Sequence, residues 1–134
     1  MDRQRTGVLV VASGAPWESA ALRELTARPT IVVLKRCMDV TDLMATAATG
    51  QASVAVVSLD APGLDPAAVD HLHRHGVRPV AVVQPDASTD VPAVLARLGL
   101  TGTVDARRLD RLPDAVLAAG SRPGASSETT ATDA

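Results

Sequence analysis

The stretch VVSLDAPGLDP, residues 56–66, leads from an apolar run through a tight turn into the start of a helix. The run at 54–59 is mostly apolar and rich in valine, which is typical of a strand covered on both faces. The Ala-Pro-Gly turn at 61–63 follows, and Asp65 with Pro66 forms an N-cap and first-turn pair. A buried strand followed directly by a helix is the building unit of parallel α/β sheets.

The same alternation of strand and helix recurs along the whole chain. The other predicted strands are 8–12, 31–34, 79–83 and, more weakly, 103–106. The predicted helices are 17–27, 40–49, 66–75, 91–98 and 111–119, with N-caps at Asp39, Asp65, Asp90 and Asp110 and stops at Gly50, Gly76, Gly99 and Gly120. This alternation predicts a flavodoxin-like, doubly wound α/β domain with helices on both faces of a parallel sheet. Right-handed crossovers favour the strand order 2-1-3-4-5.

Composition limits the classes of partner. The net charge is −2 and Trp17 is the only aromatic residue, so the chain lacks the basic face and the stacking rings of nucleic-acid binders. Cys37 is the only cysteine, which excludes an intramolecular disulfide and a cysteine-based zinc site. The apolar stretch near the N-terminus is too short for a signal peptide or a membrane span. We therefore predict a cytoplasmic protein with no nucleic-acid partner and no direct membrane insertion.

The end of the chain differs in composition from the rest. Residues 121–134, SRPGASSETTATDA, are small and polar, with nothing large and apolar to bury. We expect residues 1–120 to form one domain and 121–134 to be a disordered linker leading to a further domain. A frayed natural terminus is the alternative.

The predicted ligand-binding edge carries few chemical groups. Ligands of doubly wound folds bind beyond the carboxyl ends of the strands. The residues expected there are Ala12, Ser13, Ser58, Asp60 and Gln84. Asp60 is the one carboxylate among them.

At these positions the chain resembles the CheY-like receiver family. The resemblance extends over residues 7–119 and is most specific at the turn at 61–63 followed by Asp65. It places the family's phosphate-accepting aspartate at Ser58, its magnesium-binding acidic pair near Ala12 and Ser13, and its hydroxyl residue after the fourth strand at Gln84. The family's lysine after the fifth strand has no lysine counterpart, although Arg107 and Arg108 are near. The resemblance therefore implies a degenerate phosphoacceptor site.

The missing carboxylates decide the expected chemistry. Phosphoryl transfer to a carboxylate needs a divalent cation, and magnesium binds through one or two carboxylates. We expect no catalytic residue, no enzymatic activity, no bound metal and no cofactor, with Asp60 bracing the turn at Pro62. One alternative is a divergent phospho-accepting receiver that uses Asp60. Another is a small-molecule-responsive sensor with a pocket at the edge between the first and third strands.

A narrower resemblance rests on the text at 8–22, 31–65 and 73–83. This text is similar to the N-terminal atypical receiver domain of actinobacterial CpaE/TadZ-like septum-site-determining or pilus-assembly proteins. In those proteins the receiver-like domain precedes a MinD/ParA-type P-loop ATPase domain. The resemblance implies a pseudo-receiver that serves interaction or localisation of such an ATPase, in the same longer chain or in trans. The chain itself has no G-x-x-x-x-G-K-[ST] motif.

The receiver resemblance also implies an interaction face formed by helix 91–98, strand 103–106 and helix 111–119, through which the chain could form a homodimer. The candidate residues of this face are Arg97, Leu98, Arg108, Arg111 and Leu112. Trp17 is a separate candidate anchor, because tryptophan is enriched at binding hot spots. The competing interpretations are burial in the core for the leucines and cover of the sheet edge for Trp17.

For two further features we expect no role in binding or catalysis. His71 and His75 stand at the i, i+4 spacing that zinc sites use, but no third ligand is near, so we expect a solvated helix end. The basic neighbours of Cys37 could lower its pKa, although an inert thiol is the expectation.

Overall fold

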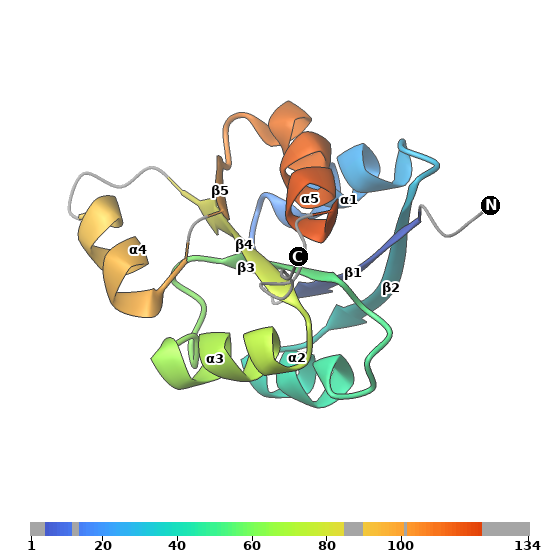
Figure 1. Cartoon of the computed structure of the whole chain (residues 1–134). Coiled ribbons are helices and arrows are strands. Elements are labelled where there is room, and N and C mark those ends of the chain that lie inside the picture. Colours follow the sequence, from blue (N-terminus) through green and yellow to red (C-terminus); the bar gives the residue numbers. More distant parts are fainter. Residues whose placement is uncertain (1–4, 12–13, 85–89, 101, 122–134) are drawn as a thin grey trace, which may run out of the picture.

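Strands and helices alternate along the described chain, which comprises residues 5–11, 14–84, 90–100 and 102–121 of a computed structural model (Figure 1). The elements are β1 (Thr6–Val11), α1 (Glu18–Thr26), β2 (Ile31–Cys37), α2 (Val40–Ala47), β3 (Val54–Ser58), α3 (Pro66–Arg74), β4 (Arg78–Val83), α4 (Val91–Leu98), β5 (Gly102–Asp105), the short 3-10 helix η2 (Leu109–Arg111) and α5 (Leu112–Ser121). Of the linker predicted at 121–134, Ser121 is instead the last residue of α5, and residues 122–134 lie outside the described residues.

The sheet is parallel, with strand order β2-β1-β3-β4-β5, so the predicted fold class is confirmed. In register, Val10 of β1 pairs with Val56 of β3, Val56 pairs with Val80 of β4, and Val80 pairs with Gly102 of β5. Helices α1 and α5 cover one face of the sheet, α2 and α3 cover the other, and α4 lies beside the β4–β5 side (Figure 1). The carboxyl ends of all five strands therefore meet at one edge.

The period-two alternation of strand side chains divides the core between the two faces. Val8, Val10 and Val56 belong to the cluster under α1 and α5, whereas Leu9 and Val57 belong to the cluster under α2 and α3. All five are at most 1% exposed, which explains why the strands read as continuous apolar runs.

Three of the predicted helix caps are confirmed. The side chains of Asp39, Asp65 and Asp90 accept hydrogen bonds from the backbone N–H groups three residues further on, at 2.8, 2.8 and 3.2 Å. Each such cap is worth about 1 kcal/mol to its helix.

The fourth cap, Asp110, was predicted wrongly. Asp110 lies inside η2, and its carboxylate accepts hydrogen bonds from Arg108 instead. The 3-10 turn places residues three apart on one side, so both Leu109 and Leu112 enter the core.

Gly120 is not a helix stop, because it lies inside α5. A Cβ at this position would stand 2.8 Å from Thr6 Cγ2 and 3.3 Å from Val54 Cγ2. The glycine thus permits α5 to approach the sheet closely.

Strand β2 runs three residues beyond its predicted end at 34. Its register against β1 shifts between Val8 and Leu9, so Leu34 is an extra, bulged residue. Lys35 and Arg36 continue the strand and are exposed, because β2 is an edge strand. Because these two residues are polar, they end the apolar run on which the strand prediction rests, and the predicted strand is therefore too short.

Candidate functional site

Ser58 and Asp60 meet where β3 ends at the carboxyl edge of the sheet. Ser58 is the last residue of β3, and its Oγ donates a hydrogen bond to Asp60 Oδ1 at 2.5 Å. Asp60 is exposed, whereas Ser58 is half-buried. The position that the receiver resemblance assigns to a phosphate acceptor therefore holds a hydroxyl group, and the adjacent carboxylate is already its hydrogen-bond acceptor.

Backbone hydrogen bonds order the loop that carries Asp60. The N–H of Leu59 donates to Val82 O at 2.9 Å, which extends the β3–β4 ladder by one residue. The N–H of Ala61 donates to Ser58 O at 3.0 Å, and the N–H of Leu64 donates to Ala61 O at 3.1 Å. These two successive turns define where the loop goes between the sheet and α3.

The loop between β1 and α1 is organised by a carboxylate that the sequence analysis missed. Ala12 and Ser13 lie outside the described residues. Beyond them, Glu18 accepts hydrogen bonds from the N–H groups of Gly14 and Ala15, at 3.1 and 2.9 Å. Glu18 is 9% exposed and begins α1, where a negative charge favours the helix dipole. An acidic residue in the first helical turn after a small-residue loop is the signal that could have revealed it.

Arginines pair with carboxylates on the β5 side of the edge. Arg107 donates two hydrogen bonds to Asp105, from Nε at 3.2 Å and from its terminal nitrogen at 3.0 Å, and its backbone N–H adds a third at 2.8 Å. These bonds lower the pKa of Asp105 below its ordinary value. Arg108 forms the same bidentate pair with Asp110 and lowers the pKa of that carboxyl. Both guanidinium groups near the position of the missing lysine are therefore held by local acids.

The carboxylates of the edge do not gather into a cation site within the described part of the chain. Across residues 5–11, 14–84, 90–100 and 102–121, no group of three or more His, Cys, Asp or Glu side chains is placed to hold a metal ion. What the described edge offers is hydrogen-bonding capacity at Asp60 and Gln84, both of which are exposed.

Burial corrects the apolar part of the predicted interaction surface. Leu112 is fully buried and Leu98 is 3% exposed, so both belong to the core, as the competing interpretation held. Trp17 is 4% exposed within the cluster under α1 and α5, and among the described residues its Nε1 has no hydrogen-bond partner. Trp17 is therefore a core residue and not an exposed anchor. Arg97 and Arg111 remain exposed, as does Arg108 in its pair with Asp110.

The cysteine and the histidines take structural roles. Cys37 is fully buried, and burial raises the pKa of its thiol, opposite to the effect expected from its basic neighbours. His71 donates from Nε2 to Met44 O at 3.1 Å, which ties α3 to α2. Its ring centroid lies 4.6 Å from that of His75. Desolvation lowers the pKa of His73, so this side chain favours its neutral form.

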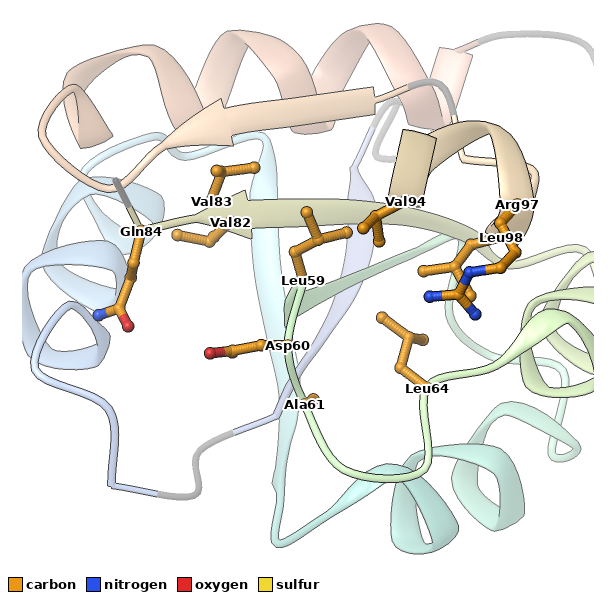
Figure 2. A pocket seen from close by; sticks show the side chains of 10 residues that line it. All are labelled: Leu59, Asp60, Ala61, Leu64, Val82, Val83, Gln84, Val94, Arg97 and Leu98. Atoms are coloured by element: carbon orange, nitrogen blue, oxygen red, sulfur yellow. The ribbon is translucent and has the colours of Figure 1, made fainter. Parts of the chain in front are cut away.

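A pocket of about 490 Å³ adjoins the Ser58–Asp60 turn on the side away from β1 (Figure 2). It lies between the β3–α3 loop, the end of β4 and helix α4. The sensor alternative placed its pocket between the first and third strands, where Ala12 and Ser13 lie outside the described residues. The described cavity is thus on the other side of β3.

No protein-family model and no curated protein sequence matches the chain. Solved structures do match. The signal receiver domain of the response regulator NarL from Mycobacterium tuberculosis is 17% identical, with a TM-score of 0.73 over 89% of this chain and 98% of that chain. The response regulator domain of Thermotoga maritima CheB is 16% identical, with a TM-score of 0.69 over 87% of this chain and 96% of that chain.

RcsB, solved as two dimers bound to two parallel DNAs, is 20% identical, with a TM-score of 0.68 over 85% of this chain and 63% of that chain. Identities this low carry the fold alone. Strand order, helix placement and these neighbours together establish that the chain has the fold of response-regulator receiver domains.

Proposed function

We propose that this chain is a pseudo-receiver, a non-catalytic module that mediates protein–protein interaction without being phosphorylated. The hydrogen bond from Ser58 to Asp60 carries the proposal. A receiver accepts its phosphoryl group on a carboxylate at the end of the third strand, and this chain has an alcohol there. The one carboxylate beside it follows the strand, is exposed, and is engaged by that alcohol.

The electrostatics of phosphoryl transfer support the same proposal. The transferred group spreads negative charge over its oxygens, and a divalent cation normally neutralises that charge. Asp60 would have to share such a cation with other carboxylates. The nearby described acids are occupied, since Glu18 binds backbone N–H groups and Asp105 binds Arg107.

The proposed partner is a MinD/ParA-type ATPase domain, in the same longer chain or in trans. The similarity of residues 8–22, 31–65 and 73–83 to CpaE/TadZ-like proteins supports this choice. The process would be septum-site determination or pilus assembly in the cytoplasm. Residues 1–120 would form the module and 121–134 the linker. Within the described residues, no helix has both the length and the apolar character needed to cross a bilayer.

The proposed contact surface is the face of α4, β5 and α5, which could also support a homodimer. Arg97 and Arg111 supply its exposed charge. Arg108 is paired with Asp110, so it contributes less free charge than the sequence suggested. The fold neighbour RcsB has been solved as dimers, which gives a precedent for self-association of a protein containing this fold.

Phosphorylation is tested first. We expect the intact mass of the chain to stay unchanged after incubation with acetyl phosphate and Mg²⁺, because Ser58 replaces the acceptor and no described carboxylate cluster holds the cation. A receiver that retains its acceptor aspartate, treated in parallel, confirms that the reagent is active. Gain of one phosphoryl group by the wild type, lost in Asp60→Asn, would overturn the proposal in favour of the phospho-accepting alternative.

Self-association is tested by reversing one exposed charge. We expect Arg111→Glu to weaken any dimer roughly tenfold. The substitution would remove the attraction between Arg111 and an acidic group across the interface and would place two negative charges opposite each other. Sedimentation velocity over a range of concentrations measures this. Arg36→Glu, on edge strand β2 at the opposite side of the sheet from β5, is the matched control. Equal dimerisation of the Arg111 and Arg36 variants would remove this face from the proposal.

A further inference from the structure

Helix α4 covers its side of the sheet incompletely. Its apolar side chains recur at helical spacing, at Val91, Val94, Leu95 and Leu98, which is the pattern of a helix that packs by one face. Only Leu98 is buried, whereas the other three are half-buried. The apolar face of α4 is therefore turned toward the protein but does not fill the space beneath it.

The unfilled space is the pocket of about 490 Å³. Its apolar walls comprise Leu59 from the loop after β3, Leu64 before α3, Val83 of β4, and Val94 and Leu98 of α4. The volume lies within the range of roughly 300–1,000 Å³ that is usual for small-molecule sites. The apolar part of its wall would gain contacts with the apolar body of a ligand.

Three polar side chains make the two ends of the pocket chemically different. Asp60 and Gln84 lie toward one end, whereas Arg97 lies with Leu64 and Leu98 toward the other (Figure 2). Among the described residues, Arg97 has no hydrogen-bond or ion-pair partner, unlike Arg107 and Arg108, which are both held by aspartates. Its guanidinium is thus available to an anion at the wall of the pocket.

These groups select the charge of an occupant. An arginine fork matches a carboxylate in two parallel hydrogen bonds. The carboxylate of Asp60 at the far end disfavours a second negative charge. The apolar walls disfavour a ligand that is polar throughout, such as a sugar phosphate. Residues 122–134 carry no apolar side chain other than alanine and proline, so this segment does not supply a suitable apolar group.

We propose that the pocket between α4, β4 and the β3–α3 loop binds a small monocarboxylate with an apolar body. The carboxylate pairs with Arg97, the apolar body packs against the leucine and valine side chains, and the far end approaches Asp60 and Gln84. This site goes beyond the interaction module proposed above. It shares Arg97 with the proposed α4–β5–α5 face, but it requires neither phosphorylation nor a protein partner on that face.

Octanoate is the probe for this site. In methyl-resolved NMR titrations of the full chain, octanoate is expected to shift the methyl signals of Leu59, Leu64 and Val94. Octanol, which has the same chain but no charge, is expected to bind roughly tenfold more weakly, because it lacks the charge-assisted hydrogen bonds to Arg97. Acetate, which has the charge but little apolar body, is expected to leave these signals unmoved.

Two variants separate the charge from the cavity. Arg97→Gln is expected to weaken octanoate binding roughly tenfold while leaving octanol binding unchanged. Arg23→Gln, a matched change on α1, is expected to alter neither. Val94→Phe, at a half-buried position of α4, fills the cavity and is expected to abolish binding of both compounds.

Several results would overturn the proposal. Equal affinity for octanoate and octanol, or unchanged octanoate binding in Arg97→Gln, would contradict recognition of the anion. Methyl shifts that map outside the pocket, or octanoate binding that survives in Val94→Phe, would place the site elsewhere. Shifts of the pocket methyls on dilution alone would mean that a second copy of the chain occupies it. Arg97→Gln is a surface change, so the proposal remains falsifiable even if Val94→Phe fails to fold.

Discussion

At the scale of single residues, the same side-chain type has different roles depending on its backbone neighbours. Asp60 was recognisable in the sequence as the one acid near the predicted site, and the structure places it there. Glu18 was not recognised, because its role depends on the path of the loop at Gly14 and Ala15. Likewise, the local pair of Asp105 and Arg107 forms only because the chain turns after β5.

Asp42 provides a prediction on the dependence of stability on pH. Its carboxylate accepts hydrogen bonds from the Met38 N–H and from Lys35 Nζ, both at 2.9 Å. The bond from Met38 and then that from Lys35 lower its pKa from the ordinary 3.8. A carboxyl whose pKa is lower in the folded chain stabilises the fold above the unfolded pKa, and this contribution is lost as the pH falls through the folded pKa. We expect Asp42→Asn to be less stable than wild type at neutral pH and to approach it as the pH falls below 3.8.

Urea unfolding followed by the fluorescence of Trp17, the only tryptophan, measures this difference. Lys35→Met is the companion variant. It leaves the bond from Met38 in place, so it should retain part of the pH dependence that Asp42→Asn removes. A constant difference between wild type and Asp42→Asn from neutral to acid pH would show that the lowered pKa of Asp42 does not contribute to stability.

At the scale of elements, local signals predicted where most strands and helices begin, and tertiary contacts decided the exceptions. Capping aspartates mark the starts of α2, α3 and α4 correctly, because a cap is satisfied within its own turn. Strand β2 extends beyond its predicted end because an edge strand tolerates the polar residues Lys35 and Arg36. Gly120 resembled a helix stop, yet it serves the contact of α5 with β1 and β3, which no local pattern encodes.

Gly120→Ala tests this contact between α5 and the sheet. An alanine inside a helix is normally favoured over glycine by about 0.5–1 kcal/mol. Here its Cβ would lie 2.8 Å from Thr6 Cγ2, on a stiff, β-branched side chain in a strand. Overpacking of this kind costs about 1–3 kcal/mol, so we expect a net loss of about 1 kcal/mol in the free energy of unfolding.

A double-mutant cycle identifies the cause of that loss. Thr6→Ser removes the Cγ2 methyl group and is expected to recover most of the stability of Gly120→Ala. Gly102→Ala is the control, because its Cβ would lie in ordinary contact, 3.6 Å from Val80 Cγ2. Stabilisation by Gly120→Ala alone would mean that α5 does not approach the sheet this closely.

At the scale of the whole molecule, the sequence predicted the architecture but not the quality of its packing. Five apolar runs separated by helices suffice for the strand order, because handedness and short connections leave few alternatives. The distance between a helix and the sheet depends on the summed shapes of side chains from several elements. The space beneath α4 therefore could not be predicted, although Leu59, Val83 and Leu98, which line it, each belong to a predicted strand or helix.

The uneven packing predicts uneven local stability. Helix α4 buries one side chain, Leu98, whereas α1 buries Glu18, Ala21 and Leu25 over a similar length. Local opening costs less free energy where fewer apolar side chains leave the core. We expect the backbone amides of α4 to exchange with deuterium at least tenfold faster than those of α1, measured residue by residue by NMR under conditions where the chain stays folded.

Two comparisons make this expectation specific to the packing of α4. Helix α2 has the same length as α4, eight residues, and the same kind of aspartate cap, but it buries Val40, Leu43 and Ala47. Its amides should therefore exchange at rates closer to those of α1. Val94→Phe should slow exchange in α4 and leave α2 unchanged, because the added ring fills the space that now separates the helix from β4. Exchange in α4 as slow as in α1 would mean that the helix is held by contacts other than its own apolar face. The whole-molecule contrast between a closely packed sheet with four covering helices and one looser helix would then be wrong.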